Sequence, residues 1–475
     1  MKGTSLPIVL ATLLLTGCTM APAYKQPTMP VPENWPTGPA YQAAPSAQAT
    51  TAPASIPWHD FYLNEQMRQV IDLALKNNRD LRITALNIDR AQALYRIRRA
   101  DLLPAVYAAG SGVKQGVPAD LAKEGEAYTA KEYSVNVGIT SWEVDFFGRV
   151  RSLKDQALQQ YFATQEAWRS ARIALMAEVA NLYLALAADR ESLKLSVDTL
   201  KSQEESFRLI ERRFNVGSSS MLDVRQAQTR MEAARRDVAL FTTRIAQDEN
   251  ALTFLVGASI PPHLLPGGMD PDAVLRDISV GLPSEVLLNR PDIMQAEDQL
   301  KAANAYIGAA RAALFPSITL TTSIGSATPE LSHLFTAGAQ TWLFMPQISM
   351  PIFDPRTWSA LKAVKVEREI VLAQYEKAIQ TGFREVADAL AQRGTIEDQI
   401  SAQRALVDAT SEAYRLADAR YQRGIDSYLT VLDAQRSLYA AQQILITLRL
   451  QRLGNLVTLY KVLGGDNASP AVPSS

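Results

Sequence analysis

Cysteine and histidine are scarce in this sequence, and their scarcity excludes several kinds of site. The 475 residues include one cysteine, so neither an intrachain disulfide nor a cysteine cluster for zinc or iron–sulfur can form. The three histidines, His59, His263 and His333, are scattered without the spacing of metal ligands. The sequence contains no GxxxxGK[ST], HExxH or GxSxG motif. We therefore expect no enzyme, no metal site and no cofactor.

An excess of basic residues is also missing. Lys and Arg number 48 against 49 Asp and Glu, which excludes the broad basic surface of a nucleic-acid-binding protein. Hydrophobic residues make up 47% of the chain and charged residues 20%, so the composition is not that of a disordered protein. The chain is therefore expected to fold and to have partners other than nucleic acid.

The N-terminus indicates export from the cytoplasm. Met1-Lys2 precedes an apolar stretch at 6–15, which is too short to span a bilayer and is typical of a signal peptide at 1–17. The stretch ends in Leu-Thr-Gly-Cys at 15–18, which resembles the lipobox of bacterial lipoproteins and predicts a covalent lipid on Cys18. In such lipoproteins Thr19, rather than Asp, favours the outer membrane. The alternative is an ordinary signal peptide with a buried cysteine.

A proline-rich strap follows the lipobox. Nine prolines lie between residues 21 and 57, so this segment is extended rather than helical, and we read 18–58 as an acylated N-terminus and strap. No later apolar run approaches the roughly 18 residues that a spanning helix needs. If the protein crosses a membrane, it is therefore expected to do so with strands.

The rest of the sequence is an internal duplication. Asp80 matches Asp292 and Pro104 matches Pro316 at a shift of 212, and residues 208–228 match 415–435 at a shift of 207. This predicts two repeats, 59–257 and 284–464, joined by a linker at 258–283 and followed by a flexible tail at 465–475.

Each repeat has the same order of expected elements. Hydrophobic spacing predicts a helix from about 61 to 103 that ends at Pro104, and alternating residues such as those at 133–140 and 317–324 predict strands. A proline-free run of about 66 residues then corresponds to roughly 100 Å of helix. The expected hairpins are about 105–145 and 317–353, the long helices 149–214 and 356–421, and the returning helices 221–255 and 428–462.

The number of strands determines how the chain can assemble. Four strands cannot close a barrel, and an open sheet edge is not tolerated in lipid. Two, three or four chains would supply 8, 12 or 16 strands. We therefore expect a mainly α protein with a small β part, in which strands and helices are pooled across subunits.

Several long motifs resemble one family. They are DFFGR at 145–149, GLPSEVLLNRPDI at 281–293, AANAYIGAARAALFPSITL at 302–320 and YLTVLDAQRSLYAAQQ at 428–443. With the lipobox, they make the chain similar to the outer membrane factor family of TolC-like exit ducts, and within it to the lipoproteins of the OprM type.

The resemblance implies an assembly and a location. It implies a homotrimer with a 12-stranded β-barrel in the outer membrane, continued by a long α-helical barrel in the periplasm. It also implies two protein partners, a periplasmic adaptor and an inner-membrane pump of the proton-driven RND type.

The candidate site is the periplasmic mouth. The turns at Gly217 and Gly424 lie farthest from the strands, so they are the expected tips and the expected contacts for an adaptor. Leu429 and Asp433 share one helix face, and a symmetric assembly would repeat them as an apolar ring and a carboxylate ring. The resemblance assigns these two residues to the aperture constriction, while the family's second acidic ring falls on Thr430. The alternative is that Leu429 packs in the coiled coil and Asp433 is a solvated charge.

A closed mouth needs ties between neighbouring helices. By resemblance, Arg420 and Tyr421 match positions that make such ties, and Asp223 is a plausible acceptor. Surface pairs of this kind are worth only about 0–1 kcal/mol each, which suits a lock that a partner opens. The alternative is that Arg420 is a solvated helix charge.

Four functions follow from these observations. The first is a passive exit duct of a tripartite efflux pump for drugs or other toxic small molecules, and the second is a duct of the same fold for copper or silver ions or for secreted proteins. The third is a periplasmic coiled-coil lipoprotein without a pore, against which the duplicated strand pairs argue. The fourth, a membrane-attached enzyme, lacks a catalytic constellation.

Overall fold

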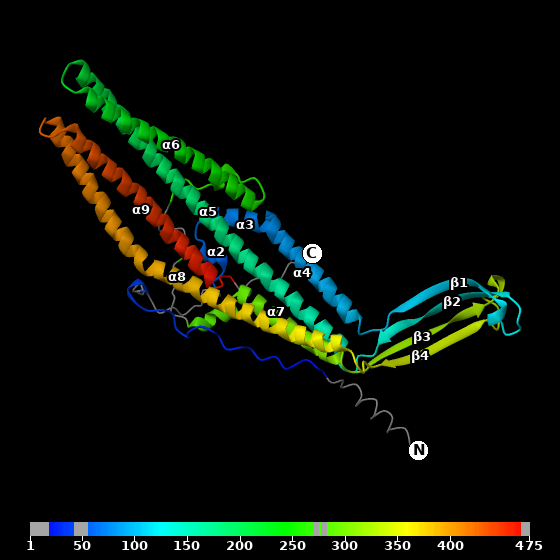
Figure 1. Ribbon diagram of the computed structural model, residues 1–475. Helices are drawn as coiled ribbons and strands as arrows, with labels where there is room; N and C mark the ends of the chain where they lie inside the picture. Colours follow the sequence, from blue (N-terminus) through cyan, green and yellow to red (C-terminus); the bar gives the residue numbers. More distant parts are fainter. Residues whose placement is uncertain (1–18, 42–55, 270–274, 277–282, 467–475) are drawn as a thin grey trace. The chain divides into compact units, whose positions relative to one another are not determined.

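The helices and strands follow the duplicated order that the sequence predicts (Figure 1). The computed structural model describes residues 19–41, 56–269, 275–276 and 283–466. The first repeat contains α2 (Trp58–Phe61), α3 (Glu65–Asn77), α4 (Arg79–Ala100), β1 (Val106–Val117), β2 (Tyr128–Glu143), α5 (Arg149–Asn215) and α6 (Met221–Val256). The second contains α7 (Pro291–Ala312), β3 (Ser317–Thr328), β4 (Gln340–Ser349), α8 (Pro355–Gln422) and α9 (Tyr428–Val462).

The chain forms two units, and each is described by itself. Unit 1 holds residues 19–28, 87–164 and 295–375, which include all four named strands. Unit 2 holds the described residues of 29–86, 165–294 and 376–466, which include both helical tips. The long helices α5 and α8 belong to both units.

The strands of unit 1 form one antiparallel sheet in the order β1-β2-β3-β4. The duplication therefore places the two hairpins side by side, joined through β2 and β3. Within the described chain, β1 and β4 each have a neighbour on one side only. Large apolar side chains on these two edge strands are exposed; they include Val106, Tyr107, Trp342, Phe344 and Ile348.

The central pair of strands depends on two glycines. A Cβ on Gly138 would lie 2.1 Å from the Thr322 carbonyl oxygen, and one on Gly325 would lie 2.1 Å from that of Val135. The strands can approach this closely only because neither residue has a side chain. A bulge between Ile139 and Trp142 then shifts the register of β2.

The helix predicted from 61 to 103 is wrong as a single element, because it is divided at Asn78 into α3 and α4. The Asn78 side chain accepts a hydrogen bond from the backbone N–H of Leu81 at 2.8 Å and donates one to the Leu255 carbonyl at 2.7 Å. Asn78 thus caps α4 and connects it to the end of α6. The long helices α5 and α8 and the returning helices α6 and α9 begin and end within one residue of the predicted limits.

The break has a counterpart in the second repeat. The shift of 212 places Asn78 on Arg290, which precedes α7 and whose Nη1 donates to the Val462 carbonyl at the end of α9 at 2.9 Å. Gly257 and Gly464, which follow α6 and α9, both have left-handed backbones with φ near 75° and 79°. Each repeat therefore ties the end of its last helix to the start of its α4 or α7.

The core of unit 2 includes aromatic rings from both ends of the chain. Phe61 stacks on Tyr460 with ring centroids 4.0 Å apart, and the Tyr460 hydroxyl donates to the Ile56 carbonyl at 2.7 Å. Phe61, Tyr62, Met67 and Ile71 are fully buried. The first helices and the last helix are consequently packed together in one unit.

Two further features differ from the sequence prediction, one at the C-terminal tail and one in the apolar runs. Asp466 belongs to the predicted tail, but it is buried and pairs with Arg172 at 2.8 Å. Helix α5 does contain an 18-residue stretch apolar enough to cross a membrane, although 61% of that stretch is buried within the structure. Its apolar residues therefore serve mainly helix packing.

Candidate functional site

The two helical tips lie at the same end of unit 2 and are built alike (Figure 1). Gly217 and Gly424 have φ of 76° and 74°, in the left-handed region that favours glycine. The residue after each glycine donates its N–H back into the preceding helix: Ser218 to the Arg213 carbonyl at 2.8 Å, and Ile425 to the Arg420 carbonyl at 3.0 Å. This bonding is the Schellman pattern that ends helices at glycine.

The tips have open space at their turns. An added Cβ at Gly217 or Gly424 would meet no atom within 4 Å, so each glycine is required by backbone conformation and not by close packing. Val216 and Ile425 beside the turns are 79% and 58% exposed. Both turns are therefore accessible in the single chain, as a surface for a partner must be.

An apolar cluster holds the two tips together. It unites residues of α5, α6, α8 and α9, all within unit 2. Its buried members are Ile210, Val224, Ala227, Ala417, Tyr428, Val431 and Leu432. The predicted constriction residues on α9 are therefore mounted on a packed four-helix end.

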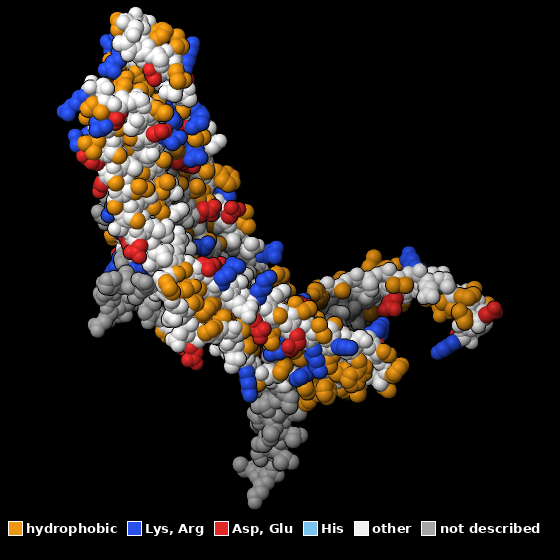
Figure 2. All heavy atoms as spheres, turned by 60° about the vertical axis from the view of Figure 1, so that its left-hand side comes forward, with side chains coloured by type: hydrophobic (Ala, Val, Ile, Leu, Met, Phe, Trp, Pro, Cys, Tyr) orange, Lys and Arg blue, Asp and Glu red, His pale blue; other side chains and the backbone are white. Residues whose placement is uncertain are grey.

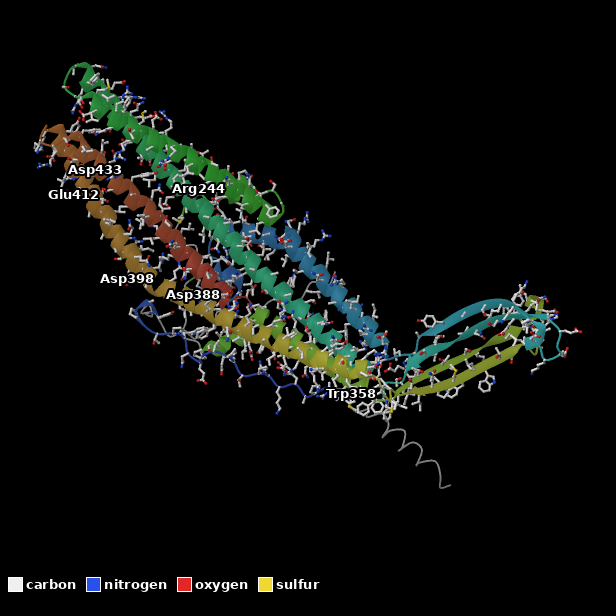
Figure 3. The ribbon with its side chains drawn as sticks, in the orientation of Figure 1. Arg244, Trp358, Asp388, Asp398, Glu412 and Asp433 are labelled. Atoms are coloured by element: carbon white, nitrogen blue, oxygen red, sulfur yellow. The ribbon has the colours of Figure 1, made fainter. Side chains whose placement is uncertain are left out.

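Leu429 and Asp433 lie on the exposed side of α9, away from the buried residues of this cluster. Figure 3 labels Asp433 near the tip. Leu429 is 49% exposed, and the Asp433 side chain is 53% exposed. The nearest charged partner of Asp433 is Arg436, whose Nη2 lies 3.3 Å from Oδ1. The single chain thus presents both residues on one free face, which is the arrangement that a symmetric ring requires.

Arg420 closes its own turn. Its Nε donates to Asp426 Oδ2 at 2.6 Å, and its Nη2 donates to Oδ1 at 3.0 Å. These two hydrogen bonds from the Arg420 guanidinium hold the pKa of Asp426 below its usual value. Sequence reasoning did not identify Asp426. The available signal was a carboxylate two residues after the glycine of the turn.

The Asp223 carboxylate is hydrogen-bonded within its own chain, at the start of α6. Its Oδ2 accepts hydrogen bonds from the Ser220 hydroxyl at 2.7 Å and from the Ser220 N–H at 3.0 Å, while the Asp223 N–H donates to the Ser220 hydroxyl. This is a capping box. These bonds, with the hydroxyl of Ser220 first, lower the pKa of Asp223. Ser219 adds a further hydrogen bond at 3.1 Å.

Tyr421 packs inside the tip. Its ring centroid lies 5.2 Å from that of Tyr428, and the guanidinium of Arg213 lies 5.1 Å from its centre. A cation over an aromatic ring at this distance is attractive. Tyr421 therefore connects α8 with α5 and α9 in one chain, and the predicted tie from Arg420, Tyr421 or Asp223 to a neighbouring chain stays a prediction.

Charged side chains lie on the face of this end of unit 2 that Figure 2 shows. Glu412 pairs with Arg415 at 2.6 Å, and Gln422 donates to Asp418 at 2.7 Å. Among the described residues, no group of three His, Cys, Asp or Glu side chains could hold a metal ion. Cys18 lies outside the described residues.

Comparison with known proteins extends over nearly the whole chain. A family model described as "Outer membrane efflux protein" matches residues 70–258 and 282–465. Two Pseudomonas putida proteins, the antibiotic efflux pump outer membrane protein ArpC and the toluene efflux pump outer membrane protein TtgC, are each 49% identical over 98% of this chain and 96% of their own length. A crystal structure of a membrane protein from Pseudomonas aeruginosa superposes with a TM-score of 0.90 at 40% identity, covering 96% of this chain and 99% of that one.

Proposed function

Because this chain belongs to the outer membrane efflux protein family, we propose that three copies of it form the exit duct of a tripartite efflux pump. The protein is an efflux duct of the outer membrane and extends into the periplasm. The proposal concerns how the duct is assembled, where it narrows, what passes through it and what it binds.

The proposal of a trimer rests on one observation, the open edges of the sheet. The four-stranded sheet has open edges at β1 and β4, with apolar side chains exposed on both edge strands. Unpaired backbone groups are too costly in lipid, so the edges must pair with strands of other copies. Three copies supply a barrel of twelve strands, within the known range for outer-membrane barrels. A rod without a pore would have no use for such a sheet.

The constriction is proposed at Leu429 and Asp433. Both residues are exposed on α9 near the tip, so a trimer repeats them as an apolar ring followed by a carboxylate ring. Three nearby carboxylates repel one another and attract cations. Repulsion within the carboxylate ring thereby lowers the barrier to opening, and the ring favours positively charged solutes.

Partners are proposed at the turns. A periplasmic adaptor contacts the exposed ends at Gly217 and Gly424, and an inner-membrane pump, of the RND type, supplies the energy. The adaptor must bind the open state of the tips more tightly than the closed state, because only differential affinity shifts such an equilibrium. The duct itself acts without catalysis.

The cargo is proposed to be toxic small molecules, such as antibiotics and solvents, as the names of the two P. putida relatives suggest for those proteins. A deletion strain should become more susceptible to such compounds. Increased susceptibility to copper or silver alone would instead support the alternative cargo of metal ions.

Lipid on Cys18 is proposed as a second anchor to the membrane. The lipobox sequence supports it, and a lipoprotein of this type carries several acyl chains, which bind membranes firmly where a single chain does not.

Single-channel conductance in planar bilayers tests the duct and its constriction together. Asp433→Ala shortens the side chain and removes the ring of charge, so we expect a larger conductance and weaker cation selectivity than in the wild type. Glu412→Ala is the matched control, because Glu412 is also an exposed carboxylate paired with an arginine three residues later at the same end of unit 2 (Figure 3).

The outcomes separate three cases. Conductance that changes in Asp433→Ala and not in Glu412→Ala supports the constriction. Conductance unchanged in both variants keeps the duct but moves the constriction elsewhere. No conductance from protein shown to be inserted would contradict the duct.

A further inference from the structure

Unit 1 contains a pocket of about 390 Å³ between the strap, α7 and α8. Its lining is partly apolar, with Pro22, Ile307 and Val366, and partly cationic, with Arg311, Lys362, Lys365 and Arg368. A pocket lined by both apolar and cationic side chains fits an amphiphile with a negatively charged head.

The strap wall of the pocket is fixed in place. Asn304 Nδ2 donates to the Pro22 carbonyl at 2.7 Å, and Arg311 Nη1 donates to the Met20 carbonyl at 3.3 Å. Gly308 lets the strap approach, since an added Cβ would lie 2.8 Å from the Cα of Ala21. The pocket is therefore built into the docked strap and is more than a gap between side chains.

Positive charge in the pocket is in excess. Its one carboxylate, Glu369, pairs with Arg368 at 2.6 Å. Lys362 and Lys365 are exposed and form no ion pair with any carboxylate in the described part of the chain. Two ammonium groups are thus available to an anion.

Helix α8 places these lysines at the depth of lipid headgroups. Trp358, in its first turn, is 66% exposed (Figure 3), and Phe353 just before the helix is 87% exposed. Exposed aromatic residues next to membrane strands mark the interface with water. Lys362 follows Trp358 by one turn, about 6 Å along the axis, and Lys365 by about 10 Å. The headgroup layer is about 5–8 Å thick, and lysine side chains extend toward it.

The proposed acylation of Cys18 leads to the same depth. Pro22 follows Cys18 by four positions, and an extended chain of that length spans at most about 14 Å. A lipid on Cys18 would hold the strap side of the pocket near the membrane surface.

We propose that this pocket is a binding site for an anionic phospholipid of the periplasmic leaflet. Lys362 and Lys365 contact the phosphate, and the apolar residues Pro22, Ile307 and Val366 contact the glycerol and the first carbons of the acyl chains. The inference rests on the proposed function in one respect, since it requires the sheet of unit 1 to lie in the outer membrane. The site couples the docked strap to the lipid around the barrel.

Native mass spectrometry of the delipidated full-length protein tests the site. The probes are phosphatidylglycerol and phosphatidylcholine with the same acyl chains. The wild type should retain phosphatidylglycerol preferentially, and the double variant Lys362→Gln/Lys365→Gln should reduce its apparent affinity about tenfold or more, because each lysine near a lipid headgroup contributes substantially. Lys377→Gln, an exposed lysine further along α8, is the matched control.

The other results overturn the proposal. Equal retention of phosphatidylglycerol by the wild type and the double variant would show that the lysines are not its contacts. Displacement of the lipid by inorganic phosphate at millimolar concentration would show a general anion site. Conductance measured on the same preparation distinguishes the two proposals: conductance without lipid preference contradicts only the lipid site, and absent conductance contradicts the duct.

Discussion

At the scale of single residues, the two tips differ at one position that the duplication makes directly comparable. Asp223 in the first repeat corresponds to Thr430 in the second, at the shift of 207. Helix α6 consequently starts with a capping box at Ser220 and Asp223, whereas the Ser427 side chain makes no capping hydrogen bond at the start of α9. The two tips thus share a backbone but differ in how their returning helices begin.

This difference predicts an asymmetric response to acid. The pKa of Asp223 is lowered in the folded chain, chiefly by the Ser220 hydroxyl, so its contribution to stability is complete above the ordinary pKa of an aspartate and disappears as the pH falls through the lowered value. We expect the first turn of α6 to lose protection below about pH 4, while the first turn of α9 changes little. Hydrogen exchange, corrected for intrinsic rates, measures both turns in one sample.

Three substitutions test this account further. Asp223→Asn should remove the dependence on pH from α6, and Thr430→Asp should introduce it at α9, where Ser427 is the N-cap residue. Loss of the Ser220 hydroxyl in Ser220→Ala should cost about 1 kcal/mol of local stability. Parallel loss of protection at both turns on acidification would contradict this account.

The partner of Arg420 shows what sequence reasoning misses at this scale. The spacing of Leu429 and Asp433 is helical, and their shared exposed face follows from it. Arg420 and Asp426 are six residues apart and meet only because the left-handed backbone at Gly424 reverses the chain between them. A pair defined by a turn has no periodic signal, so the sequence predicted a more distant acceptor.

At the scale of elements, most boundaries were predictable because their causes are local. Proline at 104 and 316 and glycine at 217 and 424 stop helices whatever surrounds them, and the duplication doubles each signal. The division at Asn78 is only partly local, since its side chain caps α4 by accepting a hydrogen bond from the Leu81 N–H. It also depends on a hydrogen bond to Leu255, which is 177 residues away, and on the close approach of Asn77 to Gly257. Tertiary contacts of this kind cannot be read from hydrophobic spacing.

The strap packs against α7 at Gly308, and we expect one added methyl group there to disturb this contact. In Gly308→Ala the new Cβ would lie 2.8 Å from Ala21 and 2.5 Å from the Ser152 hydroxyl, so the strap must shift. We expect the exposed Lys25 to be cleaved faster by trypsin in this variant. Gly116→Ala is the control in the same unit, because its added Cβ meets nothing within 4 Å.

Cleavage rates decide between two roles for Gly308. Faster cleavage in Gly308→Ala alone means that the glycine admits the strap. Equal rates in both variants and the wild type would show that the strap is held by its hydrogen bonds at Asn304 and Arg311 and tolerates the methyl group.

At the scale of the whole molecule, the duplication supplies the prepaired sheet that the barrel in the membrane needs. Two hairpins from one chain join through β2 and β3, so each copy brings a prepaired sheet with one open edge at each side. Closing the barrel then requires only the pairing of β4 of one copy with β1 of the next. That interface lies in the strands, whereas Cys18 lies far earlier in the sequence, before the strap.

The separation predicts that the proposed lipid and the proposed trimer are independent. Cys18→Ser should abolish incorporation of radiolabelled palmitate and leave trimers in the outer membrane, because backbone pairing between strand edges is obligatory in lipid while acyl chains contribute only attachment. The measurement is native mass of the extracted protein beside the labelling. If the variant is present but only monomeric, the acyl chains must act during insertion, holding each copy at the membrane until its strand edges meet those of its neighbours.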